Sequence, residues 1–101
     1  MELIIQEQEK TLAVILKGKL DSLEAPEAEA ELLPKIEDNE FETLVIDCSE
    51  LTYIASSGLR LFFMLVRTGK MNGARVVLKG VNDFVMSVLD STGMAAMFEF
   101  E

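Results

Sequence analysis

The sequence predicts an α/β fold in which about three to four helices pack on a mixed β-sheet of four to five strands. Two observations carry this prediction. Short β-rich runs alternate with segments of helical length, in the order strand, strand, helix, strand, helix, strand, helix, strand. Only the first two runs are close enough for a hairpin, so the later strands must be joined by crossover helices. A chain of 101 residues has room for one modest core, and we expect one domain over residues 1–101.

The first third of the chain reads as a hairpin followed by a helix. The runs "LIIQEQ" (3–8) and "TLAVILK" (11–17) flank the polar pair "EK", a pattern typical of a hairpin. The second run is apolar almost throughout, which predicts a strand that is covered on both faces and ends at Gly18. In "SLEAPEAEAELLPKIE" (22–37), Ser22 is the expected helix cap, and Pro34 predicts a kink or an early end.

The middle of the chain reads as a central strand followed by an amphipathic helix. "TLVIDC" (43–48) is a β-rich run bounded by acids, and "SSGLRLFFMLVRTGKMNG" (56–73) has helical length. At about 100° per residue, two opposite arcs of this helix differ in character. The arc expected to face the core holds Leu59, Phe62, Leu65 and Val66, with Phe63 at its margin, and the opposite arc holds Arg60, Met64, Arg67 and Met71.

The last third reads as strand, helix and a short terminal strand. "ARVVLKG" (74–80) predicts a buried strand after a glycine turn. A helix with an Asn or Asp cap follows, with apolar repeats at Phe84, Val85, Val88 and Leu89, and it stops at Gly93. A short strand is expected near residues 97–100.

Composition excludes several classes of function. Nine Lys and Arg against eighteen Asp and Glu give a net charge of −9, so we expect protein partners rather than nucleic acid or an anionic membrane. The chain has no His and one Cys, Cys48, which excludes catalytic triads, a disulfide within the chain and most zinc sites. We therefore expect no enzyme, cofactor or metal. The chain start does not resemble a signal peptide, and we expect a cytoplasmic protein without a membrane span.

The stretch "TYIASSGLR" (52–60) is the main candidate site, because functional groups collect where strands end and helices begin. Ser56 is expected to be the helix cap or to stand just before it, with the helix beginning near Ser57. The simplest interpretation is a capping serine only. The alternative, a functional hydroxyl, depends on the surrounding pattern.

Three segments carry a family resemblance that covers essentially the whole chain: "GKLD" (18–21), "TLVIDCSELTYIASSGLRLF" (43–62) and "GARVVLKGVNDFVMSVLDSTGMAAMFEF" (73–100). Their order and spacing resemble a STAS domain, the domain of the bacterial anti-sigma factor antagonist family. The resemblance implies a STAS-like sheet. It also implies partner switching: the unphosphorylated protein binds an anti-sigma factor that is a serine kinase, which releases the sigma factor for transcription. Phosphorylation ends this binding, and a serine phosphatase restores it.

By this resemblance Ser56 is the phosphoacceptor, with Ser57 as the alternative, and Asp21 is the loop acid beside it. Two residues depart from the family pattern. Ala55 stands where the family usually has aspartate, and Arg60 where a small residue is common. Arg60 is either an ordinary solvated cation or a group that reaches a phosphate or an acidic partner. The expected partner-binding residues are Asp21, Ala55, Ser56, Ser57, Gly58, Arg60 and Met64.

Ala55 also supports an alternative function: a STAS module that is not phosphorylated and binds a protein or a small ligand constitutively. Met64 has two interpretations, a filler beneath a neighbouring loop or an adaptable contact for a partner. Cys48 is expected to be a small apolar filler at the end of a buried strand. A nucleotide-binding or enzymatic α/β domain is disfavoured by the lack of His, of a phosphate-binding loop and of a basic surface.

Overall fold

The computed structural model describes residues 1–101 and contains one five-stranded sheet in the order β1-β2-β3-β4-β5. β1 and β2 form an antiparallel hairpin, and the β2-β3, β3-β4 and β4-β5 pairs are parallel. This confirms the predicted mixed sheet and its element order. The strands are β1 (Glu2–Gln8), β2 (Thr11–Leu20), β3 (Thr43–Ile54), β4 (Arg75–Lys79) and β5 (Glu99–Phe100).

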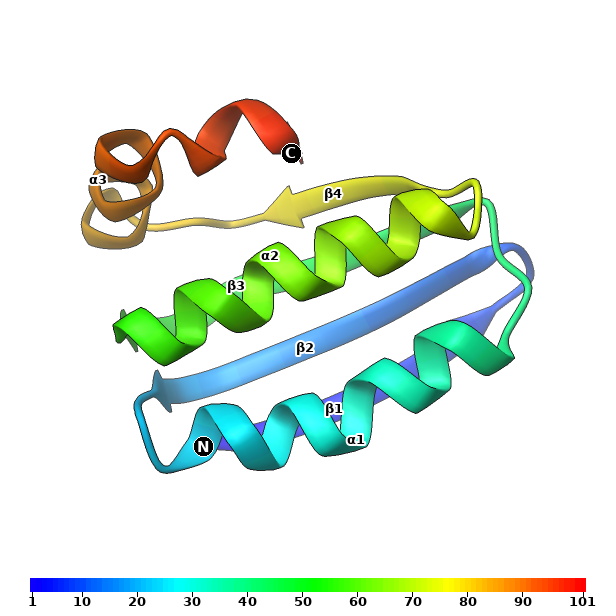
Figure 1. The fold of residues 1–101 in the computed structure, drawn as a ribbon, viewed down its shortest axis with the longest axis horizontal. Helices are drawn as coiled ribbons and strands as arrows, with labels where there is room; N and C mark the ends of the chain where they lie inside the picture. Colours follow the sequence, from blue (N-terminus) through cyan, green and yellow to red (C-terminus); the bar gives the residue numbers. More distant parts are fainter.

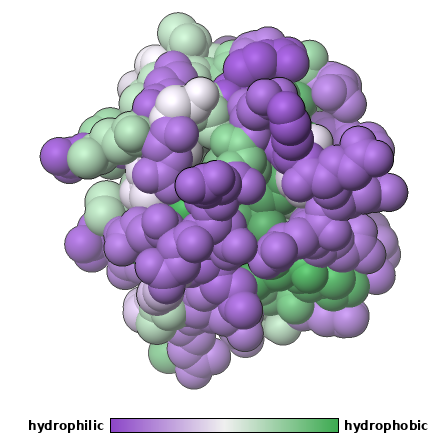
Figure 2. All heavy atoms as spheres, turned by 90° about the vertical axis from the view of Figure 1, so that its right-hand side faces the viewer, coloured by the Kyte–Doolittle hydropathy of each residue, from purple (hydrophilic) through white to green (hydrophobic).

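Two long helices cover one face of the sheet. α1 (Glu24–Asp38) and α2 (Ser56–Met71) lie side by side on this face, and α3 (Asp83–Thr92) lies beyond the end of β4 (Figure 1). A short 3₁₀ turn, η1 (Met94–Met97), connects α3 to β5. At the end of the molecule where the β1–β2 and α2–β4 turns lie, the surface is mostly hydrophilic (Figure 2). None of the helices is long and apolar enough to cross a membrane.

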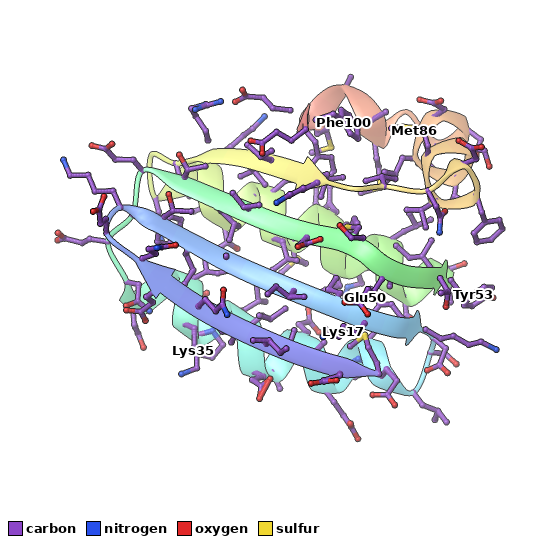
Figure 3. The ribbon with its side chains drawn as sticks, turned by 180° about the vertical axis from the view of Figure 1, so that it is seen from behind. Lys17, Lys35, Glu50, Tyr53, Met86 and Phe100 are labelled. Atoms are coloured by element: carbon purple, nitrogen blue, oxygen red, sulfur yellow. The ribbon has the colours of Figure 1, made fainter.

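The core lies between the two long helices and the sheet, and the opposite face of the sheet is open (Figure 3). Along β2 the buried residues Leu12, Val14 and Leu16 alternate with the half-buried Ala13 and Ile15. The prediction that this strand is covered on both faces is therefore wrong. Its open-face residues are half-buried, and Ile15 pairs with the half-buried Ile4 across the hairpin.

Both strands that lead to the candidate site are longer than predicted. β2 does not end at Gly18 but continues to Leu20, since the glycine adopts φ +102° at an irregularity in the pairing. β3 continues beyond Cys48 to Ile54. Two register shifts each give β3 one extra residue relative to β2, so the buried residues Cys48, Leu51 and Ile54 follow at intervals of three.

The start of α1 and its proline differ from expectation. The Asp21 carboxylate, not Ser22, accepts hydrogen bonds at the helix start: Oδ1 accepts from Leu23 N at 3.0 Å and Glu24 N at 2.9 Å. The helix also continues past Pro34 to Asp38, so the predicted early end is wrong. The carbonyl that the proline cannot bond belongs to an exposed turn, where water is available.

The other helices largely match the sequence pattern. The buried face of α2 includes Phe62, Leu65 and Val66 as predicted, while Leu59 is half-buried and Leu61 joins the core. In α3 the Asn cap is confirmed, because Asn82 Oδ1 accepts a hydrogen bond from Val85 N at 2.8 Å. The predicted stop is also confirmed: Gly93 closes the helix with φ +78°. Of its predicted apolar repeats, Val85 and Leu89 are buried, Val88 is half-buried and Phe84 is exposed.

Candidate functional site

The site is formed where β2 and β3 end, at the left of Figure 1. Leu20 and Ile54, the last residues of these parallel strands, pair in register. The Ala55 amide donates a hydrogen bond to the Leu20 carbonyl at 3.0 Å. This bond ties the turn before α2 to the loop that carries Asp21. The structure thus brings the two predicted segments to the same end of the sheet.

Ser56 is the first residue of α2, so the helix begins one residue earlier than predicted and Ser56 is not its cap. β3 extends to Ile54, so Ala55 alone connects the strand to the helix and occupies the cap position with extended backbone (φ −94°, ψ 176°). No side chain accepts a hydrogen bond at this cap, and the first turn contains no acid. The exposed Ser56 side chain therefore lies at the N-terminus of α2, beside backbone amides that have no partner within the helix. The helix dipole is positive at this end.

Asp21 holds the neighbouring loop in shape. Its carboxylate oxygen Oδ1 accepts two hydrogen bonds from the start of α1, and its carbonyl accepts a third from Ala25 N at 3.0 Å. The side chain is half-buried. One carboxylate oxygen is therefore used structurally, and the loop is fixed relative to the Ser56 turn through the bond from Ala55 to Leu20.

Ser57 differs from Ser56 in exposure. Its Oγ is buried and has no hydrogen-bond partner in the protein. It lines a small cavity of about 30 Å³ between α1 and α2, which has room for one water molecule. The other lining residues are Ala25, Pro26, Glu29, Arg60 and Leu61. Of the two serines, only Ser56 is exposed to solvent.

Gly58 allows α2 to approach the strand ends. A Cβ atom at this position would lie 2.7 Å from Ile54 Cγ1 and 3.0 Å from Leu20 Cδ2. The first distance is shorter than carbon atoms tolerate and the second is tight, and both neighbours are buried core residues. Glycine at this position therefore sets the distance between the first turn of α2 and the two strands that carry the site.

Arg60 and Met64 follow on the next turns of α2. The Arg60 Nη2 atom lies 3.9 Å from Glu29 Oε1, and the Arg60 side chain is 72% exposed. An ion pair this long and this exposed is weak, so the guanidinium is free to reorient. Met64 is half-buried, intermediate between the core filler and the contact residue that the sequence allowed.

The sequence profile described as "Mlab, STAS domain" matches residues 4–99. The chain belongs to the STAS domain family. It is 28% identical over 98 residues to BtrV of Bordetella bronchiseptica, a candidate anti-sigma factor antagonist, covering 97% of this chain and 84% of that protein.

Solved structures share the fold of this STAS domain. One is an anti-sigma factor antagonist (STAS) domain protein of Planctomyces limnophilus, with TM-score 0.86 and 14% identity, covering 98% of this chain and 87% of that one. Another is the Bacillus cell fate determinant SpoIIAA in its phosphorylated form, with TM-score 0.78 and 18% identity. The match covers 99% of this chain and 91% of that one. The five-stranded sheet and its helices are thus the STAS fold.

The sequence did not reveal a contact between α3 and the last part of β3, the strand that leads to the site. Phe84, one of the predicted apolar repeats of α3, is 48% exposed and stacks on Tyr53, with ring centroids 5.8 Å apart. Asn82 fixes this arrangement, because its Nδ2 donates to the Leu51 carbonyl at 2.9 Å. The available signal was an aromatic residue three positions before Ser56, although its partner lies 31 residues further along the chain.

Other features of this STAS domain lie apart from the Ser56 turn. The largest cavity, about 370 Å³, lies between β1 and α1 and includes no residue of that turn. It is lined by Met1, Glu2, Leu3, Glu24, Glu27, Ala28 and Glu31. Cys48 is buried, and burial, with a smaller effect of Asp47, raises the pKa of its thiol to about 12. A protonated thiol in the core suits the predicted role of an apolar filler.

Proposed function

We propose that this STAS domain is an anti-sigma factor antagonist controlled by phosphorylation of Ser56. Unphosphorylated, it binds an anti-sigma factor that is a serine kinase and so releases a sigma factor. Phosphorylated, it loses this partner until a serine phosphatase removes the phosphate. The observation that carries the proposal is the exposed Ser56 hydroxyl at the start of α2, the position that corresponds to the family's phosphoacceptor.

Two further observations support this function. A curated relative that covers nearly the whole chain is a candidate antagonist of this class. The residues around Ser56 also suit a phosphate, because the uncapped first turn of α2 offers free amides and no acid. At the positive end of the helix dipole a phosphate would be stabilised by about 0.3–1 kcal/mol, so phosphorylation is not expected to unfold the domain.

The same phosphate would oppose binding. It adds close to two negative charges at a position that the partner would cover. Burying such a charge without a matched cation costs on the order of several kcal/mol, and about 1.4 kcal/mol already weakens binding tenfold. Phosphorylation is therefore expected to disrupt the interface and leave the domain folded. No residue of this chain is assigned a catalytic role in this function.

The test requires a purified anti-sigma factor of the serine kinase class, and a gene for one beside the gene of this chain would identify it. The purified chain is incubated with this kinase and ATP, and its intact mass is measured. We expect one phosphate on the wild type and on Ser57→Ala, because the Ser57 Oγ is enclosed between α1 and α2. We expect none on Ser56→Ala. A phosphate that persists in Ser56→Ala, or disappears in Ser57→Ala, would contradict the choice of Ser56.

Ala55 favours a second candidate function, a STAS module that binds its partner constitutively. The cap position offers no carboxylate to orient the Ser56 hydroxyl or a kinase. The same experiment separates the two functions. A wild-type chain that binds the purified kinase tightly, yet acquires no phosphate from it, would be a constitutive module rather than a switch.

A further inference from the structure

The outer face of α2 differs in charge from the rest of the molecule. The chain has a net charge of −9, with eighteen acids, yet the sixteen residues of α2 include no Asp or Glu. They include three cations, Arg60, Arg67 and Lys70. The neighbouring helix α1 has the opposite character, with six acids and one lysine among fifteen residues. A basic helix therefore lies on an otherwise acidic protein.

The basic residues share a face with Ser56. Residues spaced by four, seven and eleven positions lie on the same side of a helix, which groups Arg60, Phe63 and Arg67 with Ser56. All four are exposed, and the buried residues of α2 lie on the other side. Lys70 and Met71 border this group, and both are exposed as well. We name Ser56, Arg60, Phe63, Arg67, Lys70 and Met71 the α2 outer face.

The cations of this face are unpaired or only weakly paired within the protein. Arg60 has its only acidic neighbour at 3.9 Å, and neither Arg67 nor Lys70 has an acid within 4.0 Å. Its apolar members are also uncovered, since Phe63 is 40% and Met71 76% exposed. Arg, Met and aromatic residues are enriched in protein interfaces, whereas Asp and Glu are depleted there. Four of the six members of this face, two arginines, a phenylalanine and a methionine, are thus of types enriched in interfaces.

We infer that the α2 outer face docks an acidic, partly apolar surface of the anti-sigma factor. This inference rests on the proposed function and adds the chemistry of the partner. Charge complementarity is the argument: three unpaired or weakly paired cations attract acids, and exposed Phe63 and Met71 supply apolar area between them. A phosphate on Ser56 would lower the charge of this face from +3 to about +1, which weakens attraction over the whole face.

The test compares two charge reversals that match in size. Arg67→Glu changes the centre of the α2 outer face, and Lys35→Glu changes α1 at the outer edge of the molecule (Figure 3). Both residues are exposed helical cations without an acid within 4.0 Å. Affinity for the purified anti-sigma factor kinase is measured by titration at low and at high salt, and melting temperatures are compared to verify folding.

We expect Arg67→Glu to raise the dissociation constant about five- to tenfold at low salt, since a lost attraction is added to a new repulsion. Lys35→Glu should stay within about twofold of the wild type. High salt should weaken wild-type binding and shrink the difference between the variants. Equal affinity of the two variants, or tighter binding by Arg67→Glu, would overturn the inference and leave the proposed function standing.

Other occupants of this face give distinct results. If wild-type chain fails to bind the kinase at all, the proposed function is wrong and the inference falls with it. If sedimentation detects a dimer of the chain that Arg67→Glu dissociates, the face binds a second copy, which overturns the inference. Binding of the chain to vesicles that contain phosphatidylserine, lost in Arg67→Glu, would overturn it too. The net charge of −9 argues against that last outcome.

Discussion

Replacing Gly58 by alanine should move the first turn of α2 away from the strands that support it. The new Cβ would lie 2.7 Å from Ile54 Cγ1 and 3.0 Å from the Leu20 side chain. Overpacking of a core typically costs about 1–3 kcal/mol, while alanine in a helix gains about 1 kcal/mol over glycine. The net loss of unfolding free energy is therefore about 1 kcal/mol, or roughly 4–8 °C in melting temperature for a domain of this size.

Gly69→Ala is a matched control, because Gly69 also lies on the buried face of α2 and its Cβ would approach Val76 Cγ2 to 2.8 Å. Both variants should lose similar stability in urea denaturation. Only Gly58→Ala should also slow phosphorylation of Ser56 by the kinase, since Gly69 lies three turns away. A Gly58→Ala chain that is more stable than the wild type would refute the packing argument. Equal phosphorylation of the two variants would refute the link from packing to the site.

Three further predictions follow from single contacts. Burial raises the pKa of Cys48 to about 12 from a usual 9.0, so at pH 8 the folded chain should react with iodoacetamide about a thousandfold more slowly than in denaturant. Asn82→Ala should cost about 1–2 kcal/mol in urea denaturation, because it removes both the α3 cap and the bond to Leu51; Asn82→Asp, which keeps the cap, should cost less. The hydrogen bond from Arg75 lowers the pKa of Glu99 in the folded chain. The stability that this pair contributes is therefore present above about pH 4.5, the usual pKa of a glutamate, and is lost as the pH falls through the lowered pKa of the folded state. In a series of melting temperatures measured at decreasing pH, Arg75→Ala should show a smaller fall in this acidic range than the wild type.

Local sequence patterns predicted the elements whose signals lie within a few residues. The hairpin, the Asn82 cap and the stop at Gly93 each depend on adjacent residues, and each is confirmed. The start of α1 was missed although it is local, because Asp21 and Ser22 are both suitable caps and are adjacent. A choice between two such residues depends on the direction in which the chain leaves β2.

Features that depend on distant residues could not be predicted. The end of β3 was placed six residues early because two bulges make its buried residues recur at intervals of three, which is not a strand pattern. The one-sided cover of the sheet depends on where both long helices pack. Likewise, the sequence ranks Ser57 as the alternative to Ser56 but does not show its burial, which depends on the packing of α1 against α2.

The two faces of α2 divide stability from the proposed binding. Its inner face contributes Leu61, Phe62 and Leu65 to the core, each almost fully buried, whereas Ser56 begins the outer face. A charge added to the outer face changes what a partner meets without entering the core. Under the proposed function, this arrangement would let a domain of 101 residues, with one small core, be phosphorylated and remain folded. It also requires that Ser56→Asp weaken binding to the kinase while its melting temperature stays close to that of the wild type.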